Sequence, residues 1–128
     1  MSNVTPIEIL HLTARVWGVT TAAMCKRRAG ISAASPPKRA TLAAVWLVCK
    51  HTETPMLELA HLLGYSAWAK GGDTRVMTLH RLAVECLAEV PVFAALVESV
   101  EERIDDLHDE RESRMVIASA VRSEPTHA

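Results

Sequence analysis

The segment Ala40–Cys49 constrains the fold more than any other part of this chain. Its ten residues are apolar except for Thr41, no glycine or proline interrupts it, and charged side chains lie only at its two ends. A helix that is apolar on all sides must be surrounded by other elements. The segment therefore predicts a buried central helix over about 38–51.

The rest of the chain indicates an all-α fold. It has 128 residues, of which 49% are apolar and five are glycine, and it lacks alternating runs of β-branched residues. A chain of this length forms one domain and can bury a core without disulfides. Proline, glycine and N-cap residues divide it into helical segments. We expect a single bundle of about six helices that contains a helix-turn-helix, with helices over 6–17, 20–28, 38–51, 56–63, 74–87 and 91–107.

Local signals mark several helix ends. Thr5-Pro6-Ile7-Glu8 combines a capping box with proline at the first helical position. Gly18 is expected to end that helix, and Gly64 to end the fourth. Asp73 is expected to cap the fifth helix.

Charge is distributed unevenly along the chain. Residues 9–52 contain no acidic side chain, and residues 1–82 contain ten basic and four acidic side chains, a net charge of +6. Residues 83–128 contain four basic and eleven acidic side chains, a net charge of −7, so the whole chain carries only −1. A basic region beside a helix-turn-helix is typical of proteins that bind a polyanion such as DNA. The alternative is a solvated basic surface without a partner.

The segment 56–87 is arranged like a helix-turn-helix, with a helix, Gly64, a loop and a second helix that opens with polar residues. In such a motif the second helix enters the major groove and presents its N-terminal turn to base edges. We expect its base-contacting side chains to be Asp73, Thr74, Arg75, Thr78 and Arg81. Its core-facing side then holds Val76, Leu79, Leu82 and Ala83. An ordinary helical hairpin has the same pattern, so the motif needs support from the rest of the chain.

Basic residues outside this motif are the candidates for binding phosphate. They are Lys26, Arg27, Arg28, Lys38, Arg39 and Lys70. Lys38 and Arg39 lie in the first turn of a helix, where the macrodipole disfavours positive charge. A basic pair at that place indicates an anionic partner, and the free N–H groups of a helix start also suit phosphate. Such contacts fix the position of a protein on a duplex without recognising its sequence.

The order of these elements resembles a known family. Lys26-Arg27-Arg28 matches a basic loop, and Pro37-Lys38-Arg39 resembles the Arg-Pro-Arg-Gln that opens a central helix. Residues 58–64 (Glu-Leu-Ala-His-Leu-Leu-Gly) resemble Pro-Glu-Ile-Gly-x-x-Phe-Gly, and residues 71–80 align without gaps to Gly-Gly-Arg-Asp-His-Thr-Thr-Val-Leu-His. These motifs belong to the C-terminal DNA-binding domain of the bacterial replication initiator DnaA, in the Trp-repressor-like helix-turn-helix group. The resemblance covers about residues 5–107. It implies a DNA-binding domain over 1–108, followed by a charged extension over 109–128 that is helical or partly disordered.

The chain departs from this family at the positions that recognise bases. From the signature at 71–80 only the two glycines, Leu79 and His80 remain, and residues 65–70 lengthen the turn. The resemblance therefore implies family-like docking on DNA without recognition of the initiator's own box. No Gly-x-x-x-x-Gly-Lys-Ser/Thr loop is present, so this chain does not carry the initiator's ATPase site. A DNA-binding head alone is more similar to a transcription regulator than to a replication initiator.

Other residue groups do not indicate an enzyme or a metal site. The six histidines include no i, i+4 pair and have no cysteine at ligand spacing. Glu101-Glu102 and Asp105-Asp106 lie on the polar face of an amphipathic helix, where solvation explains them. No serine or cysteine lies in a nucleophile motif. We therefore expect no catalysis, no metal and no cofactor.

Three further observations bear on location. Cys25, Cys49 and Cys86 lie among apolar neighbours, which favours reduced thiols in the cytosol. Thr5-Pro6 and Glu8 interrupt the N-terminus before the apolar run of a signal peptide develops. The longest apolar run is about half of the ~20 residues that a membrane span needs. We expect a soluble, cytoplasmic protein that does not bind membranes.

The acidic C-terminal segment has two interpretations. It is either the solvated back of the domain, or a docking segment, 115–121, for a second copy of the chain or for RNA polymerase. The leading function is a double-stranded DNA-binding transcription regulator. The alternative is a protein-interaction module, or a replication accessory factor, that kept the fold without specific recognition of DNA.

Overall fold

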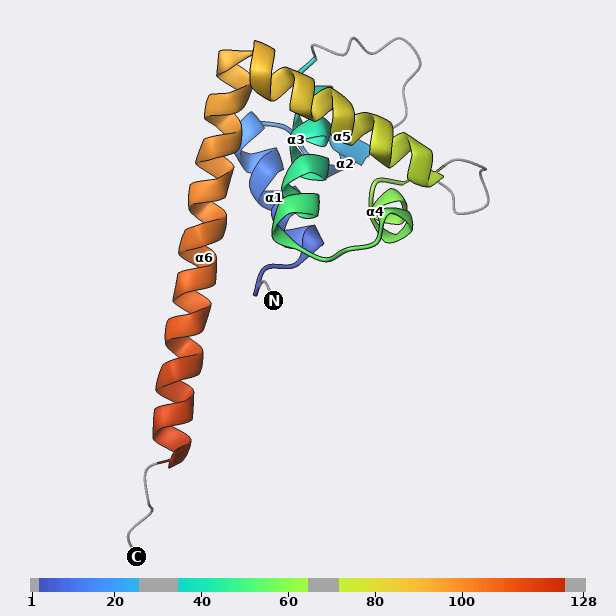
Figure 1. Cartoon of the computed structure of the whole chain (residues 1–128). Coiled ribbons are helices and arrows are strands. Elements are labelled where there is room, and N and C mark those ends of the chain that lie inside the picture. The colour runs from blue at the N-terminus through green and yellow to red at the C-terminus, as the bar shows by residue number, and fades with distance from the viewer. Residues whose placement is uncertain (1–2, 26–34, 65–71, 124–128) are drawn as a thin grey trace, which may run out of the picture.

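The computed structural model of the protein describes residues 3–25, 35–64 and 72–123 (Figure 1). The regular secondary structure in these ranges is entirely helical. The helices are α1 (Pro6–Trp17), α2 (Thr21–Cys25), α3 (Pro36–His51), α4 (Met56–Leu62), α5 (Gly72–Glu89) and α6 (Pro91–Ser123). The predicted all-α bundle of about six helices is confirmed.

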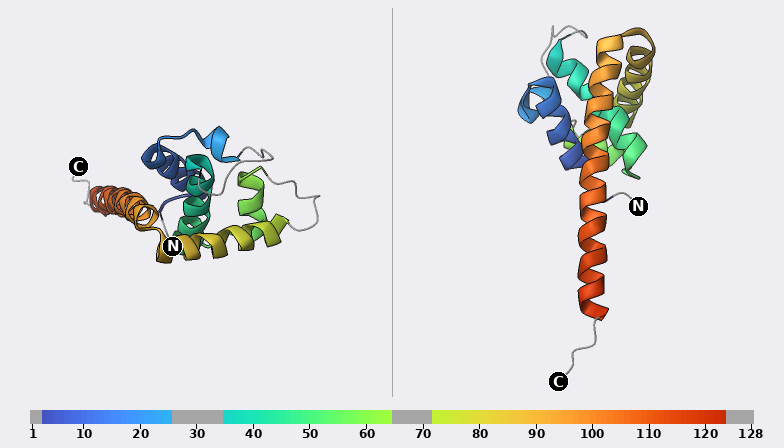
Figure 2. Two further views of the ribbon diagram at one scale, coloured as in Figure 1. Left: turned by 90° about the horizontal axis from the view of Figure 1, so that it is seen from above. Right: turned by 90° about the vertical axis from the view of Figure 1, so that its left-hand side faces the viewer.

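α3 lies at the centre of the bundle, and α1, α2, α5 and α6 all pack against it (Figure 2). Its buried residues are Ala40, Thr41, Leu42, Ala43, Ala44, Val45, Leu47 and Val48. The prediction of a buried central helix is therefore confirmed. The helix begins at Pro36, two residues before the predicted start, because the fixed φ of proline suits a first helical turn.

α1 begins and ends with the signals expected of it. The N–H of Glu8 donates to Thr5 Oγ1 at 3.3 Å, and the N–H of Thr5 donates to Glu8 Oε1 at 3.1 Å, which completes the capping box. At the other end Gly18 has a φ of 69°, and its N–H contacts the carbonyl oxygens of Ala14 and Arg15. A left-handed glycine of this kind ends a helix.

α5 and α6 are longer than predicted. α5 begins at Gly72, so Asp73 lies inside the helix and not at its N-cap. α6 continues beyond Leu107 to Ser123, over 33 residues, or about 50 Å at 1.5 Å per residue. Of the extension that we expected to be helical or partly disordered, residues 109–123 are therefore helical. The segment contains no glycine or proline after Pro91 that would end it. The last part of α6 therefore projects beyond the bundle, as Figures 1 and 2 show.

The first half of α6 closes the bundle against α1 and α3. Its inner stripe is buried, with Phe93, Val97, Val100 and Ile104 each 2% exposed or less. The ring of Phe93 meets the ring of Trp17 edge to face, with centroids 5.7 Å apart. Such a pair contributes about 0.5–1.5 kcal/mol beyond the burial of its area. This packing fixes the direction in which α6 leaves the bundle.

Candidate nucleic-acid interface

Three contacts bring the ends of α2 and α4 to the start of α3. Thr41 Oγ1 donates to the carbonyl oxygen of Met24 at 2.9 Å. Cys25 Sγ lies 3.5 Å from the carbonyl oxygen of Leu62. Gly64 lies so close to Cys25 that a Cβ atom on it would be 3.2 Å from the Cys25 carbonyl oxygen. One corner of the bundle is thus assembled from three helix ends.

The chain passes into residues 26–34 and 65–71 at this corner, after Cys25 and after Gly64. Four of the expected phosphate-binding residues belong to these segments and lie outside the described residues: Lys26, Arg27, Arg28 and Lys70. Their role stays a prediction. Cys25 and Gly64, after which the two segments begin, lie side by side in the described structure.

Lys38 and Arg39 lie in the first turn of α3, next to the same corner. Both are half-buried, and the turn contains no acidic residue. The N-cap, Ser35, makes no capping hydrogen bond with its side chain. Within the described residues, Ser35 Oγ and Arg39 Nε are buried without a hydrogen-bond partner. Both atoms are closed off from solvent, so an anion at this helix start would meet the exposed parts of the Lys38 and Arg39 side chains and not these two atoms.

The backbone at this helix start offers fewer donors than we expected from the sequence. Pro36 and Pro37 occupy the first two helical positions and have no N–H group. The N–H of Arg39 already donates to the carbonyl oxygen of Ser35 at 3.0 Å. The side chains of Lys38 and Arg39 must therefore supply most of the attraction for phosphate.

α5 has a buried face and an exposed face. Val76, Leu79 and Ala83 are buried and Leu82 is half-buried, as predicted. The exposed face carries four of the five expected base-contacting residues, Thr74, Arg75, Thr78 and Arg81. The side chain of the fifth, Asp73, lies outside the described residues. α5 is held along its length by α3, α4 and α6.

Thr78 is oriented by its own helix. Its hydroxyl donates to the carbonyl oxygen of Thr74 at 3.0 Å. Because a hydroxyl has one proton, the Thr78 oxygen then retains only acceptor positions. In a major groove the groups that donate to such an acceptor are the amino groups of adenine and cytosine.

Met77 belongs to the same exposed face, although the sequence analysis does not select it. Its side chain is 59% exposed. It follows Thr74 by three residues and precedes Arg81 by four, which is the spacing of one helical face. This spacing is visible in the sequence and would have been enough to identify Met77 as a member of the exposed face. An apolar side chain among polar ones on such a face suits contact with the methyl group of thymine.

Lys50 belongs to the basic half of the sequence but is paired in the structure. Its Nζ lies 2.7 Å from Glu101 Oε2 and 4.9 Å from the centroid of the Trp46 ring. His51 Nε2 lies 3.0 Å from the same carboxylate oxygen. Burial raises the pKa of Glu101, but the hydrogen bonds from Lys50 and His51 outweigh burial and lower that pKa overall. Glu101 thus joins the end of α3 to α6 and takes Lys50 out of the basic surface.

Two features of the described residues concern nucleophiles and metal ligands. Burial raises the pKa of the Cys25 and Cys49 thiols, which keeps them protonated and weakly nucleophilic. Within 3–25, 35–64 and 72–123, no three His, Cys, Asp or Glu side chains come together as a metal ion requires.

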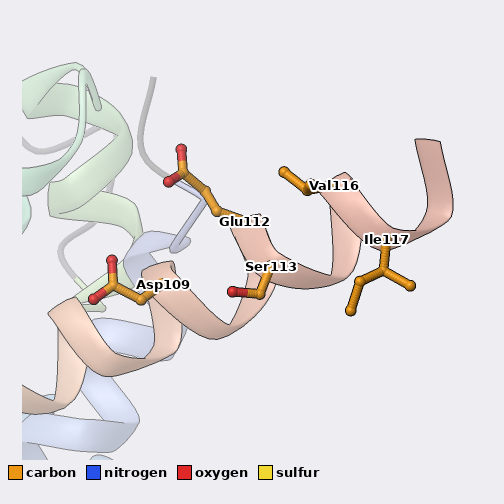
Figure 3. Close-up of a pocket in the computed structure, with 5 residues that line it drawn as sticks. All are labelled: Asp109, Glu112, Ser113, Val116 and Ile117. Atoms are coloured by element: carbon orange, nitrogen blue, oxygen red, sulfur yellow. The ribbon is translucent and has the colours of Figure 1, made fainter. Parts of the chain in front are cut away.

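Two shallow hollows occur on the described surface. The first lies on the projecting part of α6 and is lined by Asp109, Glu112, Ser113, Val116 and Ile117 (Figure 3). Since one helix supplies all five, it is an open face and not a cavity. The second, of about 450 Å³, lies between the start of α1 and the end of α3, and its lining includes Lys50 and His51. Both of these side chains are already paired with Glu101. Neither hollow has the geometry of a small-molecule site.

None of the described helices combines the length and the apolar composition needed to cross a bilayer. Comparison of the chain with protein-family models and with curated proteins finds no match. Its function must therefore be inferred from its own residues.

Proposed function

We propose that this chain binds double-stranded DNA and regulates transcription, with α4 and α5 acting as a helix-turn-helix. The observation that carries the proposal is the exposed face of α5, which presents Thr74, Arg75, Thr78 and Arg81 while the opposite face is buried. A helix with its side chains is ~10–12 Å wide, which matches the ~12 Å width of the major groove. Because α3, α4 and α6 hold the helix from behind, its exposed polar row is presented on a fixed support.

Arg75 and Arg81 supply the discrimination between bases in this proposal. An arginine that binds the O6 and N7 atoms of guanine contributes roughly 1–3 kcal/mol against the wrong base. Thr78 accepts from an amino group, and Asp73 and Thr74 contribute at the first turn. These roles follow from position on the helix and from the chemistry of each side chain.

Lys38 and Arg39 hold the phosphate backbone, together with Lys26, Arg27, Arg28 and Lys70. The first turn of α3 holds Lys38 and Arg39 and contains no acidic residue, which supports an anion at this place. Contacts of this type set the position of α5 on the duplex and contribute to affinity on every sequence.

In this proposal the chain docks on DNA in a way similar to the C-terminal domain of DnaA, but it does not recognise the initiator's box. Residues 1–108 form the DNA-binding domain, and the protein acts in the cytoplasm, where bacterial DNA lies. Binding requires no cofactor, no metal and no catalysis.

A second candidate function is a protein-interaction module, or a replication accessory factor, that keeps this fold without specific recognition of DNA. The observation in its favour is the exposed apolar segment Met115, Val116 and Ile117 on α6. In this second function the segment would bind RNA polymerase or a second copy of the chain.

Fluorescence anisotropy with labelled genomic and random duplexes, in dilute buffer, tests the proposal. The double variant Arg75→Ala/Arg81→Ala should weaken binding at least about thirtyfold, which is roughly the loss of two groove contacts. Arg103→Ala removes an exposed arginine on α6 and serves as the matched control, with an expected change below about threefold. Equal losses in both variants would contradict the assignment to α5, and absence of binding to every duplex would favour the second candidate.

A further inference from the structure

The projecting part of α6 has no partner within the described chain. Its last contact with the bundle is Arg111, which donates to Glu8 and, at 2.5 Å, to the carbonyl oxygen of Asn3. All side chains from Glu112 to Ala118 are exposed. An isolated helical segment of this length is marginal in water, so a partner that packs along it would stabilise it.

The projecting segment is apolar at its middle. Met115, Val116 and Ile117 are 63%, 68% and 63% exposed. Since successive residues are 100° apart on a helix, these three side chains cover more than half of its circumference. Large apolar side chains gathered on an exposed element mark an interaction site.

The distribution of charge along the projecting segment favours a second copy of the chain as its partner. Residues 105–112 contain five acidic side chains and one basic, whereas residues 113–123 contain Arg114, which also pairs with Glu110 of its own helix at 2.5 Å, and Arg122, and no acidic side chain. The apolar residues lie close to the midpoint of 105–123. Two such segments in antiparallel orientation bring the acidic half of each against the basic half of the other, and they bring the apolar residues together. In parallel orientation the acidic halves face one another and repel.

We propose that residues 105–123 of α6 pair antiparallel with the same segment of a second copy of this chain. The arrangement is a two-fold interface in which both copies use the same surface. The segment is about 28 Å long, and antiparallel pairing places the two bundles at its opposite ends. A single pair of helices is small beside the ~1,200 Å² of a stable interface, so the dimer dissociates at micromolar concentrations.

Sedimentation equilibrium from about 1 to about 300 µM, without DNA, tests the pairing. The wild-type chain should change from monomer to dimer across this range. Val116→Glu should raise the dissociation constant at least about tenfold. Val92→Glu is the matched control, because Val92 lies on the same helix and is likewise 68% exposed. It should leave the dissociation constant within about twofold. Both positions are exposed, so far-ultraviolet circular dichroism should be the same for all three proteins at about 1 µM, where each of them is monomeric.

Charge reversal tests the orientation of the pair. Asp109→Lys/Glu110→Lys and Arg114→Glu/Arg122→Glu should each weaken self-association, and an equimolar mixture of the two variants should form a heterodimer. A wild-type chain that stays monomeric at about 300 µM would overturn the proposal. It would do so even if RNA polymerase were found to bind this segment. Equal effects of Val92→Glu and Val116→Glu would also overturn it. Neither outcome depends on whether the chain binds DNA.

Discussion

Arg111 and Glu8 form a two-point ion pair that joins α6 to the start of α1. Arg111 Nη1 lies 2.7 Å from Glu8 Oε1, and Nη2 donates to Glu8 Oε2. The same carboxylate closes the capping box of α1 through the N–H of Thr5. One side chain therefore both begins the first helix and fixes the last point at which α6 touches the bundle.

This pair makes stability depend on acid pH. The hydrogen bond from Arg111 is the largest cause that lowers the pKa of Glu8, from 4.5 to about 2. Because the pKa is lower in the folded state, the pair stabilises the fold above pH 4.5, and this contribution is lost as pH falls toward 2. Glu8→Gln keeps an acceptor for the cap but removes the charge. At pH 7 we expect it to lose roughly 1 kcal/mol.

Urea unfolding between pH 7 and pH 2 measures this effect. The difference in unfolding free energy between wild type and Glu8→Gln should shrink to near zero at the acid end. A difference that stays constant across the range would contradict the role of the ion pair.

Gly64 and Gly18 should respond differently to alanine. Both have positive φ, 84° and 69°, so alanine strains the backbone at either position, by about 1–2 kcal/mol. Only at Gly64 does a Cβ meet another atom, the Cys25 carbonyl oxygen at 3.2 Å, whereas nothing lies within 4 Å at Gly18. Gly64→Ala should therefore destabilise more than Gly18→Ala in chemical denaturation. The opposite order would mean that α2 and α4 do not meet at this corner.

Lys38→Ala and Arg75→Ala should separate affinity from specificity. Lys38 lies at the start of α3 and Arg75 on the exposed face of α5. Removing Lys38 should weaken binding to all duplexes alike and reduce the salt slope by about one unit. Removing Arg75 should reduce the preference among sequences. Binding-site selection from a random duplex library, done on both variants, distinguishes the two effects. An Arg75→Ala protein with unchanged sequence preference would exclude base contact at that position.

Met77→Ala should lose the ability to detect the methyl group of thymine. With the wild-type protein, replacing thymine by deoxyuridine throughout a selected binding site should weaken binding about three- to tenfold. With Met77→Ala the same replacement should have little effect, because the apolar side chain that contacts the methyl group is gone. Competition anisotropy on the two duplexes measures both ratios. Equal sensitivity in the two proteins would place the methyl contact elsewhere.

Features decided by nearby residues could be predicted from the sequence. Thr5 and Gly18 act within one helical turn, so both ends of α1 were predictable. The segment at 40–49, apolar except for Thr41, required a central position whatever its neighbours. The alternation of buried and exposed residues along α5 also followed from helical spacing alone.

Features that depend on distant parts of the chain could not be predicted in this way. The partners Lys50 and Glu101 are 51 residues apart, and Arg111 and Glu8 are 103 apart. Both pairs depend on how α6 packs against α1 and α3. The length of α6 had a local signal, the lack of glycine and proline between Pro91 and Ser123, which favoured the helical form of the C-terminal extension. At the site, by contrast, the lack of N–H groups at Pro36 and Pro37 was visible in the sequence, and it transfers phosphate binding from the backbone to the side chains of Lys38 and Arg39.

The salt dependence of duplex binding tests the central claim most directly. If Lys38, Arg39 and the basic residues of 26–28 and 70 neutralise about five or six phosphates, log K should fall with log salt concentration with a slope of roughly −4.5 to −5.4. A folded chain that bound no duplex in dilute buffer, or whose binding did not change with salt, would contradict it.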